Sequence, residues 1–260
     1  MRNIMTVLGR DFKSYFSSPV AYVVIGLFLM ITGVFFYLLT SSFLQYAVNL
    51  QWQAARMRQP APPVNVNHMI LRPLFSNISV VTLFVLPMIT MRSFSEDKRT
   101  GTMELLLTSP VTTAQIVLGK FLAAFALYAI MVLITWVYPL IIILFGEPDV
   151  MPIAVSYLGI LAMGAASIAL GIWVSSMTEN QIISAMGTFV ALLFLWLVGW
   201  FSHFSTGFLG GFFNYISIIE HFDDFAKGIF DTGHLVYYLS LGGIMLFFAH
   251  QSIESLKWRS

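Results

Sequence analysis

The stretch Val20–Leu44, VAYVVIGLFLMITGVFFYLLTSSFL, contains no charged residue. It is longer than the roughly 20 apolar residues that an α-helix needs to cross a bilayer, so we expect it to span the membrane with some tilt. A cleaved signal peptide has a shorter apolar region and small residues at its cleavage site, whereas Tyr37, Leu38 and Leu39 are large. We therefore expect this segment to remain in the mature protein.

Five more long apolar runs follow the first. The six expected spans are residues 20–44, 73–91, 113–146, 153–177, 182–202 and 234–253. Once roughly 20 residues are assigned to each crossing, only short connections remain. The sequence therefore predicts an all-α membrane protein with six transmembrane helices, folded as a single transmembrane domain over residues 1–260 with no separate soluble domain.

The overall composition excludes several classes of function. Hydrophobic residues make up 58% of the chain and charged residues only 10%, whereas a soluble domain has roughly 25% charged residues. The formal net charge of +1 provides no basic field for a nucleic acid, so none is expected as a partner. The chain has no cysteine, which excludes disulfide bonds, thiolate catalysis and cysteine-bound metals.

Lysine and arginine are unevenly distributed between the two sides of the membrane. With six spans the termini lie on the same side, and nine of the thirteen basic residues fall on that side. They are Arg2, Arg10, Lys13, Arg92, Lys98, Arg99, Lys120, Lys257 and Arg259. Because basic loops tend to remain in the cytoplasm, both termini are expected there.

The segment before the first span has the periodicity of an amphipathic helix. Ile4, Leu8, Phe12 and Tyr15 share one helical face, and polar residues occupy the other. Residues 1–18 are thus expected to form an interfacial helix in the plane of the cytoplasmic head groups. The alternative is a simple charged flank that orients the first span.

A second amphipathic segment is expected outside the membrane, within residues 203–233. Ile218, Phe222, Phe225 and Ile229 repeat at helical spacing and charged residues lie opposite them. The segment can act as an external gate or lie on the outer leaflet, and the pattern does not distinguish the two. The gate candidates are Glu220, His221, Phe222, Asp223, Asp224 and Lys227. Before this helix, 204–214 is rich in glycine and phenylalanine and too broken to cross the bilayer as one helix.

Histidine and aspartate side chains in the external region raise the alternative of a metal site. The residues concerned are His203, His221, Asp223, Asp224 and His234. Their spacing matches no compact ligand pattern, and the helical periodicity already accounts for several of them. We therefore expect solvated polar residues and no metal.

The loop after the second span is unusual for a connector. Four consecutive charges, Glu96 to Arg99, precede Gly101, and an apolar segment with Met103, Leu105, Leu106 and Leu107 follows. Such apolar residues need a cover of lipid or of another protein, and the neighbouring charges can fix the register of a protein contact. The pattern predicts a short helix that lies across the cytoplasmic face and contacts a partner.

The order of these features resembles that of ABC-2 type permeases, the membrane subunits of ATP-binding-cassette exporters. The resemblance covers essentially the whole chain and includes the loop Gly101-Thr102-Met103-Glu104-Leu105-Leu106-Leu107 with Ser109-Pro110. Four further motifs resemble the gliding-motility-type branch of this family: Ser17-Ser18-Pro19, residues 91–96, residues 179–182 and residues 220–231. The long polar outer loop expected at Trp52–Pro63 departs from the family pattern.

The resemblance implies a coupling helix at residues 93–109 that docks on a separate cytoplasmic ATPase. The residues implied in coupling are Glu96, Asp97, Lys98, Arg99, Gly101, Thr102, Glu104, Leu105 and Leu106, with Glu179 and Asn180 as a secondary contact. It further implies ATP and magnesium bound by that ATPase and no cofactor on this chain, a second permease copy or homologue, and a location in the bacterial inner membrane. An accessory membrane protein with a large external domain is a further partner in this scheme.

Enzyme signatures are missing from the sequence. The nearest fragment to a nucleotide-binding loop, Gly119-Lys120-Phe121, lacks the upstream glycine and the hydroxyl that binds magnesium. A serine hydrolase using Ser167 and His250 is disfavoured, because Ser167 has the small-residue spacing of helix packing. An ATP-independent transporter would need ionisable residues at mid-membrane, which the spans lack. The chain is therefore expected not to be an enzyme, and a membrane anchor for a larger assembly stays as an alternative.

Overall fold

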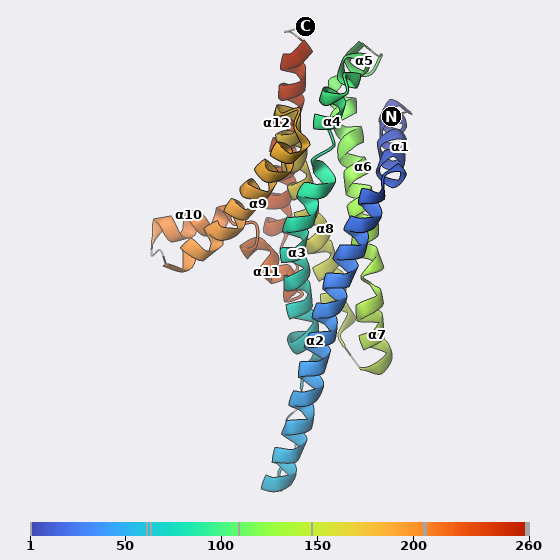
Figure 1. Ribbon diagram of the computed structural model, residues 1–260. Helices are drawn as coiled ribbons and strands as arrows, with labels where there is room; N and C mark the ends of the chain where they lie inside the picture. The colour runs from blue at the N-terminus through green and yellow to red at the C-terminus, as the bar shows by residue number, and fades with distance from the viewer. Residues whose placement is uncertain are drawn as a thin grey trace.

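The computed structural model describes residues 2–60, 62, 64–108, 110–146, 148–204 and 207–257, and all regular structure within these ranges is helical (Figure 1). Six segments are long and apolar enough to cross a membrane, which confirms the predicted all-α membrane fold. They contain α2 (Pro19–Met57), the π-helical turn η1 (Asn67–Leu71) with α3 (Arg72–Thr90), α6 (Thr113–Ile134) with α7 (Val137–Phe145), α8 (Val150–Met177), α9 (Gln181–Phe204) and α12 (Thr232–Lys257).

Five shorter helices complete the described structure. They are α1 (Arg2–Ser17), α4 (Ser95–Arg99), α5 (Thr102–Thr108), α10 (Phe208–Ile216) and α11 (Glu220–Ala226). Outside the described residues lie Pro63, Ser109 and Arg259, together with the side chains of Arg2, Leu107, His203 and Lys257.

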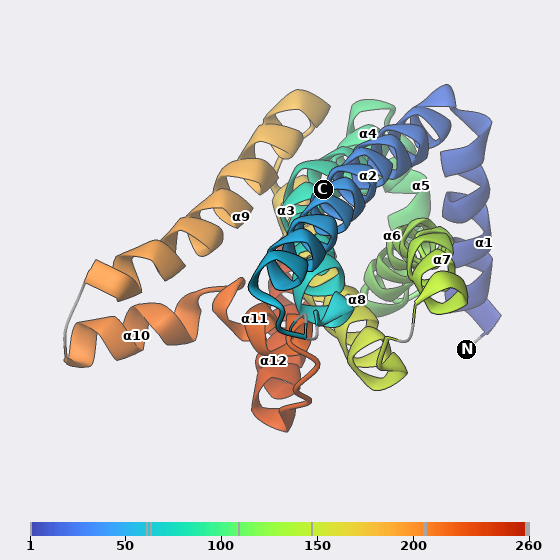
Figure 2. The same ribbon diagram turned by 90° about the horizontal axis from the view of Figure 1, so that it is seen from below.

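Helix α8 lies at the centre of the bundle because its small residues admit neighbouring side chains closely. A Cβ atom at Gly164 would lie 2.0 Å from Cε1 of Tyr128, and one at Gly171 would lie 2.2 Å from Oγ1 of Thr90. Seen along the spans, α3 and α8 occupy the middle and α2, α6, α9 and α12 surround them (Figure 2). The core of buried apolar residues accordingly runs through α3, α6 and α8.

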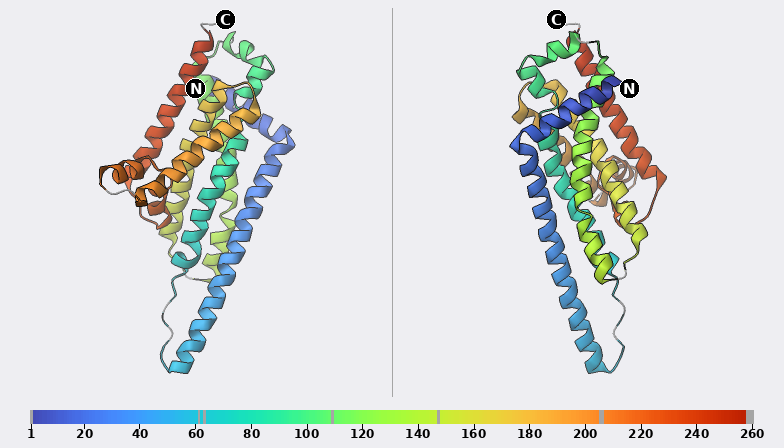
Figure 3. Two further views of the ribbon diagram at one scale, coloured as in Figure 1. Left: turned by 60° about the vertical axis from the view of Figure 1, so that its left-hand side comes forward. Right: turned by 90° about the vertical axis from the view of Figure 1, so that its right-hand side faces the viewer.

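The two ends of the molecule differ in their elements. Helices α4 and α5 lie at the same end as the start of α1 and the end of α12 (Figure 1). We call this end the terminal face, and we call the opposite end, with η1 and the end of α7, the distal face. Helix α1 lies across α6 near the terminal face (Figure 3).

Helix α1 contacts α6 through a face that includes Val7 as well as the predicted Ile4. Val7, which is not among the predicted apolar residues, is buried, and its side chain would lie 2.7 Å from a Cβ atom at Gly119. Leu8 is only partly buried. The absence of a side chain at Gly119 lets α1 approach α6 closely, so packing rather than periodicity decides which residues face inward.

The first span is longer than predicted, and the expected loop at Trp52–Pro63 is wrong in its first half. Helix α2 continues 13 residues beyond the expected end at Leu44 and reaches Met57, giving a helix about 58 Å long at 1.5 Å per residue. Residues 45–57 contain no glycine or proline and several good helix formers, so nothing in the sequence stops the helix. The left-handed backbone of Arg58 (φ 50°) then ends it.

In the external region, the segment 204–214 is not one continuous helix, as expected, although Gly210 and Gly211 lie within α10. The chain turns at Gly207, whose φ of +78° favours glycine, and α10 packs back along α9 (Figure 1). The following amphipathic helix, α11, is only seven residues long.

Candidate coupling site at the terminal face

The expected coupling helix at residues 93–109 is two helices rather than one. Helix α4 ends at Arg99, and Gly101 adopts a φ of +72° before α5 begins. The hydroxyl of Thr100 donates to the Glu96 carbonyl at 2.8 Å and closes the last turn of α4. Because side chains other than glycine rarely adopt this backbone conformation, Gly101 sets the angle between the two helices.

A cluster of charges ties α4 to two other helices. Lys120 of α6 is only 4% exposed, and its Nζ lies 2.6 Å from Oδ2 of Asp97 and 3.0 Å from Oδ2 of Asp11. Arg10 pairs with Asp11 at 2.7 Å and lies 3.8 Å from Asp97. The Lys120 ammonium also lies 5.1 Å from the centroid of the Phe94 ring. Two carboxylates and an aromatic face thus compensate a buried cation.

Hydrogen bonds to α8 hold the same segment from the other side. Lys98 Nζ donates to the Ser176 carbonyl at 2.5 Å. The Ser175 hydroxyl accepts hydrogen bonds from the backbone N–H groups of Phe94 and Ser95, at 3.0 and 3.2 Å. These bonds satisfy the first backbone N–H groups of α4, which have no partner within so short a helix.

The implied coupling residues therefore divide into an inward and an outward group. Asp97, Lys98 and Thr102 hold the loop together, since Thr102 Oγ1 donates to Asp97 Oδ1 at 2.9 Å. Glu96 and Leu106 are partly buried. The exposed group is Arg99, Gly101, Glu104 and Leu105, and the Leu105 side chain is 72% exposed. Met103, beside them in sequence, is buried in the core.

The secondary contact lies in the turn between α8 and α9. Glu179 and Asn180 are both exposed. The Asn180 Oδ1 atom accepts a hydrogen bond from the backbone N–H of Ile182 at 2.9 Å, as a residue that caps a helix does. Glu179 also interacts electrostatically with Lys98, which relates this turn to α4.

On the distal side, the apolar face of α11 is covered by the chain itself. Phe222 and Phe225 are buried, and Phe225 fits against Gly159 of α8. The apolar face of this segment therefore packs against the protein itself. Ile229, the expected fourth member of the apolar face, lies after the helix and is 54% exposed.

The polar face of α11 forms ion pairs with Arg72 of α3 and with Lys227 at its own C-terminal end. Asp223 lies 3.1 Å from Nη2 of Arg72 and 2.7 Å from Nζ of Lys227, while Asp224 contacts Lys227 at 3.0 Å. Burial alone would raise the pKa of Asp223, but hydrogen bonds from Lys227 and Arg72 outweigh it and lower the pKa. The pKa of Asp224 is lowered chiefly by the hydrogen bond from Lys227.

The remaining candidates in this region occupy structural positions. His221 stacks on Tyr237 with ring centroids 3.8 Å apart, and burial lowers its pKa. Glu220 lies beside α9, where a Cβ atom at Gly199 would be 3.2 Å from its Oε1. Among the residues that the structure describes, no three histidine, aspartate or glutamate side chains are arranged to hold a metal ion.

Two further sequence hypotheses concern residues in the spans. The Ser167 hydroxyl donates to the carbonyl of Met163 in its own helix, and His250 lies 3.4 Å from Glu254. Each group is thus engaged locally, as the packing interpretation of Ser167 expects. Sequence reasoning missed the roles of Asp11 and Lys120 in the charge cluster. The sequence signals this cluster only through Lys120, a lysine near the start of an expected span.

Comparison with known proteins identifies the family of the chain. The sequence profile of a family described as "ABC-2 family transporter protein" matches residues 5–234. No curated protein sequence is significantly similar to the chain. The matched residues include every helix from α2 to α11. A transporter family agrees with the six apolar segments that are long enough to cross a membrane. The chain is a multi-pass membrane protein and belongs to the ABC-2 transporter family.

Proposed function

We propose that the chain is the permease subunit of an ATP-binding-cassette exporter and that a separate cytoplasmic ATPase docks on its terminal face. Membership of the ABC-2 family implies an ATPase partner. The observation that carries the proposal is the exposed Leu105 on α5, next to exposed Glu104 and with exposed Arg99 at the end of α4. A large apolar side chain with charged neighbours is typical of a protein contact with a polar rim.

The attachments of α4 and α5 support a mechanical role. A push on Leu105 would reach α6 and α1 through Asp97 and Lys120, and α8 through Lys98 and Ser175. Because buried ion pairs and packed helices deform little, a displacement of the ATPase would move these spans together. ATP and magnesium would be bound by the ATPase, and this chain would supply the pathway.

A second copy or homologue would complete that pathway. Helix α3 lies between α9 and α2 on one side of the molecule (Figure 3). Although α3 is largely buried, its residues Phe84 and Met88 are exposed, and Phe84 packs against Phe189 of α9 with ring centroids 5.2 Å apart. We assign the partner permease to this surface, so that substrate would pass between the two copies.

The location and orientation follow from the same proposal. The chain would lie in the bacterial inner membrane with both termini in the cytoplasm, so that the terminal face meets the ATPase. The motif Ser17-Ser18-Pro19 and the sequence Glu220-His221-Phe222 support membership of the gliding-motility-type branch as a hypothesis. An accessory membrane protein with an external domain would meet the distal face.

Affinity purification at native expression, followed by mass spectrometry, tests the docking site. We expect the unaltered chain to retain an ATPase, and Leu105→Asp or Glu104→Lys to lose it. Leu105→Met is the matched control, because it keeps an apolar side chain of similar volume. Equal thermal midpoints would show that all variants are folded. Full ATPase recovery with Leu105→Asp and Glu104→Lys would overturn the coupling assignment, and recovery of no ATPase by the unaltered chain would favour a membrane anchor.

A further inference from the structure

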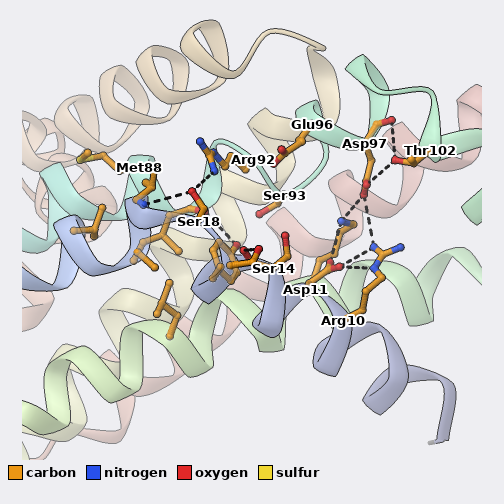
Figure 4. A pocket seen from close by; sticks show the side chains of 18 residues that line it. Arg10, Asp11, Ser14, Ser18, Met88, Arg92, Ser93, Glu96, Asp97 and Thr102 are labelled. Atoms are coloured by element: carbon orange, nitrogen blue, oxygen red, sulfur yellow. Dashed lines mark hydrogen bonds and ion pairs between the residues drawn. The ribbon is translucent and has the colours of Figure 1, made fainter.

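A pocket of about 330 Å³ lies at the terminal face between α1, α2, the end of α3 and α4 (Figure 4). This volume is within the roughly 300–1,000 Å³ that small-molecule sites occupy. One part of its lining is polar and includes Ser14, Ser18, Arg92, Ser93 and Glu96. Another part is apolar and is formed by Val20, Ala21, Val24, Met88, Ile89 and Leu127. The lining therefore suits a ligand with a polar head and an apolar body.

Most charges around the pocket neutralise one another. Arg10 and Lys120 pair with Asp11 and Asp97 on one side, and Figure 4 shows Arg92 with Ser18 away from that cluster. Within the described part of the chain, neither Arg92 nor Glu96 belongs to any of the ion pairs. The pocket thus keeps one uncompensated cation and one uncompensated anion.

Two buried polar side chains in this part of the pocket keep unused hydrogen-bonding capacity. Arg92 donates through Nη1 to the Ser18 hydroxyl at 3.1 Å, but its buried Nε has no partner. The Ser93 residue is 6% exposed, and its hydroxyl interacts only with the side chain of Tyr15. An unsatisfied buried group costs about 1–3 kcal/mol, and more when it is charged. Both residues line the pocket, so a ligand with acceptor oxygens there would reduce this cost.

We propose that this pocket binds the head group of a zwitterionic membrane phospholipid that carries a phosphate and a primary amine. The planar guanidinium of Arg92 presents N–H groups that match phosphate oxygens, and the Ser93 hydroxyl adds a donor. The Glu96 carboxylate receives the ammonium group. The apolar lining of α2 and α3 contacts the part of each acyl chain nearest the glycerol. A free phosphate compound has no acyl chains. The bound lipid joins α1, α3 and α4, and its binding requires no ATPase.

Native mass spectrometry of the full chain, purified in detergent and freed of lipid, tests this site. The probes are dioleoyl phosphatidylethanolamine and dioleoyl phosphatidylglycerol, which share a phosphate but differ in the amine. We expect one phosphatidylethanolamine to bind in preference to phosphatidylglycerol. Arg92→Ala should weaken this binding about tenfold or more, the loss expected from charge-assisted hydrogen bonds. Glu96→Gln should remove the preference between the two lipids.

Lys13→Ala is the matched control, since Lys13 is exposed on α1 but does not line the pocket. It should bind both lipids as the unaltered chain does. If Arg92→Ala fails to accumulate, Arg92→Lys keeps the charge but removes the Nε–H group, and a severalfold loss is expected.

Three results would overturn the assignment. They are unchanged phosphatidylethanolamine binding by a folded Arg92 variant, equal binding of the two lipids by the unaltered chain, and displacement of the lipid by inorganic phosphate at equal concentration. The last result would mark a site for soluble phosphate compounds instead.

Discussion

The Nδ1 atoms of His221 and His234 lie 2.7 Å apart and form a hydrogen bond between α11 and α12. His221 Nε2 faces the carbonyl of Tyr215 at 3.0 Å, and His234 Nε2 faces Oδ2 of Asp224 at 3.0 Å. Each ring therefore has a hydrogen-bond partner at both of its nitrogen atoms.

The two rings differ in their surroundings. Burial lowers the pKa of His221, although its hydrogen bond to Tyr215 opposes the effect. His234 faces the Asp224 carboxylate. The hydrogen bond between the rings links α11 to the start of the last span.

This arrangement predicts that acid weakens the fold. Because the folded-state pKa of His221 lies below its ordinary value of 6.5, the unfolded chain binds protons more readily. The contribution of His221 to the free energy of unfolding is fully present above pH 6.5. It is lost as the pH falls from 6.5 toward the pKa of His221 in the folded state. Asp223 and Asp224 also have lowered pKa values, but their contribution is lost only below their ordinary value of 3.8. We expect the midpoint temperature of thermal unfolding to decrease as the pH is lowered from 7 to 5.

His221→Phe isolates the histidine in this experiment. Phenylalanine can keep the stacking on Tyr237 but does not titrate, so the midpoint should depend less on pH over this range. His68→Gln is the control, because His68 is exposed. Identical pH profiles for the unaltered chain and His221→Phe would contradict the assignment.

The sequence predicted the helical class and the six spans because long apolar runs are a strong signal. Which side chains face inward was harder to predict. Asp97 looked like part of a surface charge cluster, but its partner Lys120 lies 23 residues later at the start of an expected span. Gly101 signalled a break, yet nothing local indicated that Lys98 would reach the end of α8. Contacts between segments that are distant in the sequence decide which side chains face inward. Periodicity predicts only which residues share one face of a single helix.

Lys120→Met should strongly destabilise the terminal face. The change leaves the carboxylates of Asp11 and Asp97 near each other without their common cation, and breaking a buried ion pair in this way costs about 3–5 kcal/mol. Thermal unfolding in detergent measures the loss. Lys13→Met, which removes an exposed lysine of α1, should have little effect. Adding Asp97→Asn to Lys120→Met should recover part of the loss, and a double variant less stable than Lys120→Met would contradict the explanation.

Gly164→Ala should loosen the packing of α6 against α8. The added methyl group would overlap the Tyr128 ring, whose hydroxyl donates to the Ile160 carbonyl at 3.0 Å. Overpacking of this kind costs about 1–3 kcal/mol. Gly243→Ala on α12 is the matched control, since a Cβ atom there meets nothing within 4 Å. It should be neutral or stabilising by up to about 1 kcal/mol. Equal thermal midpoints for the two variants would be evidence against close contact at α8.

Labelling of single cysteines can determine the orientation, because the natural sequence has no cysteine. Gln59 follows the end of α2 at the distal face, whereas Thr100 lies between α4 and α5, and both are exposed. In intact cells, we expect Gln59→Cys to react with an impermeant thiol reagent and Thr100→Cys to react only after the membrane is opened. Denatured samples, in which both cysteines should react, provide the control for reagent quality. The reverse pattern would place Leu105 outside the cell, where an ATPase has no ATP, and would overturn the proposed docking site as well as the orientation.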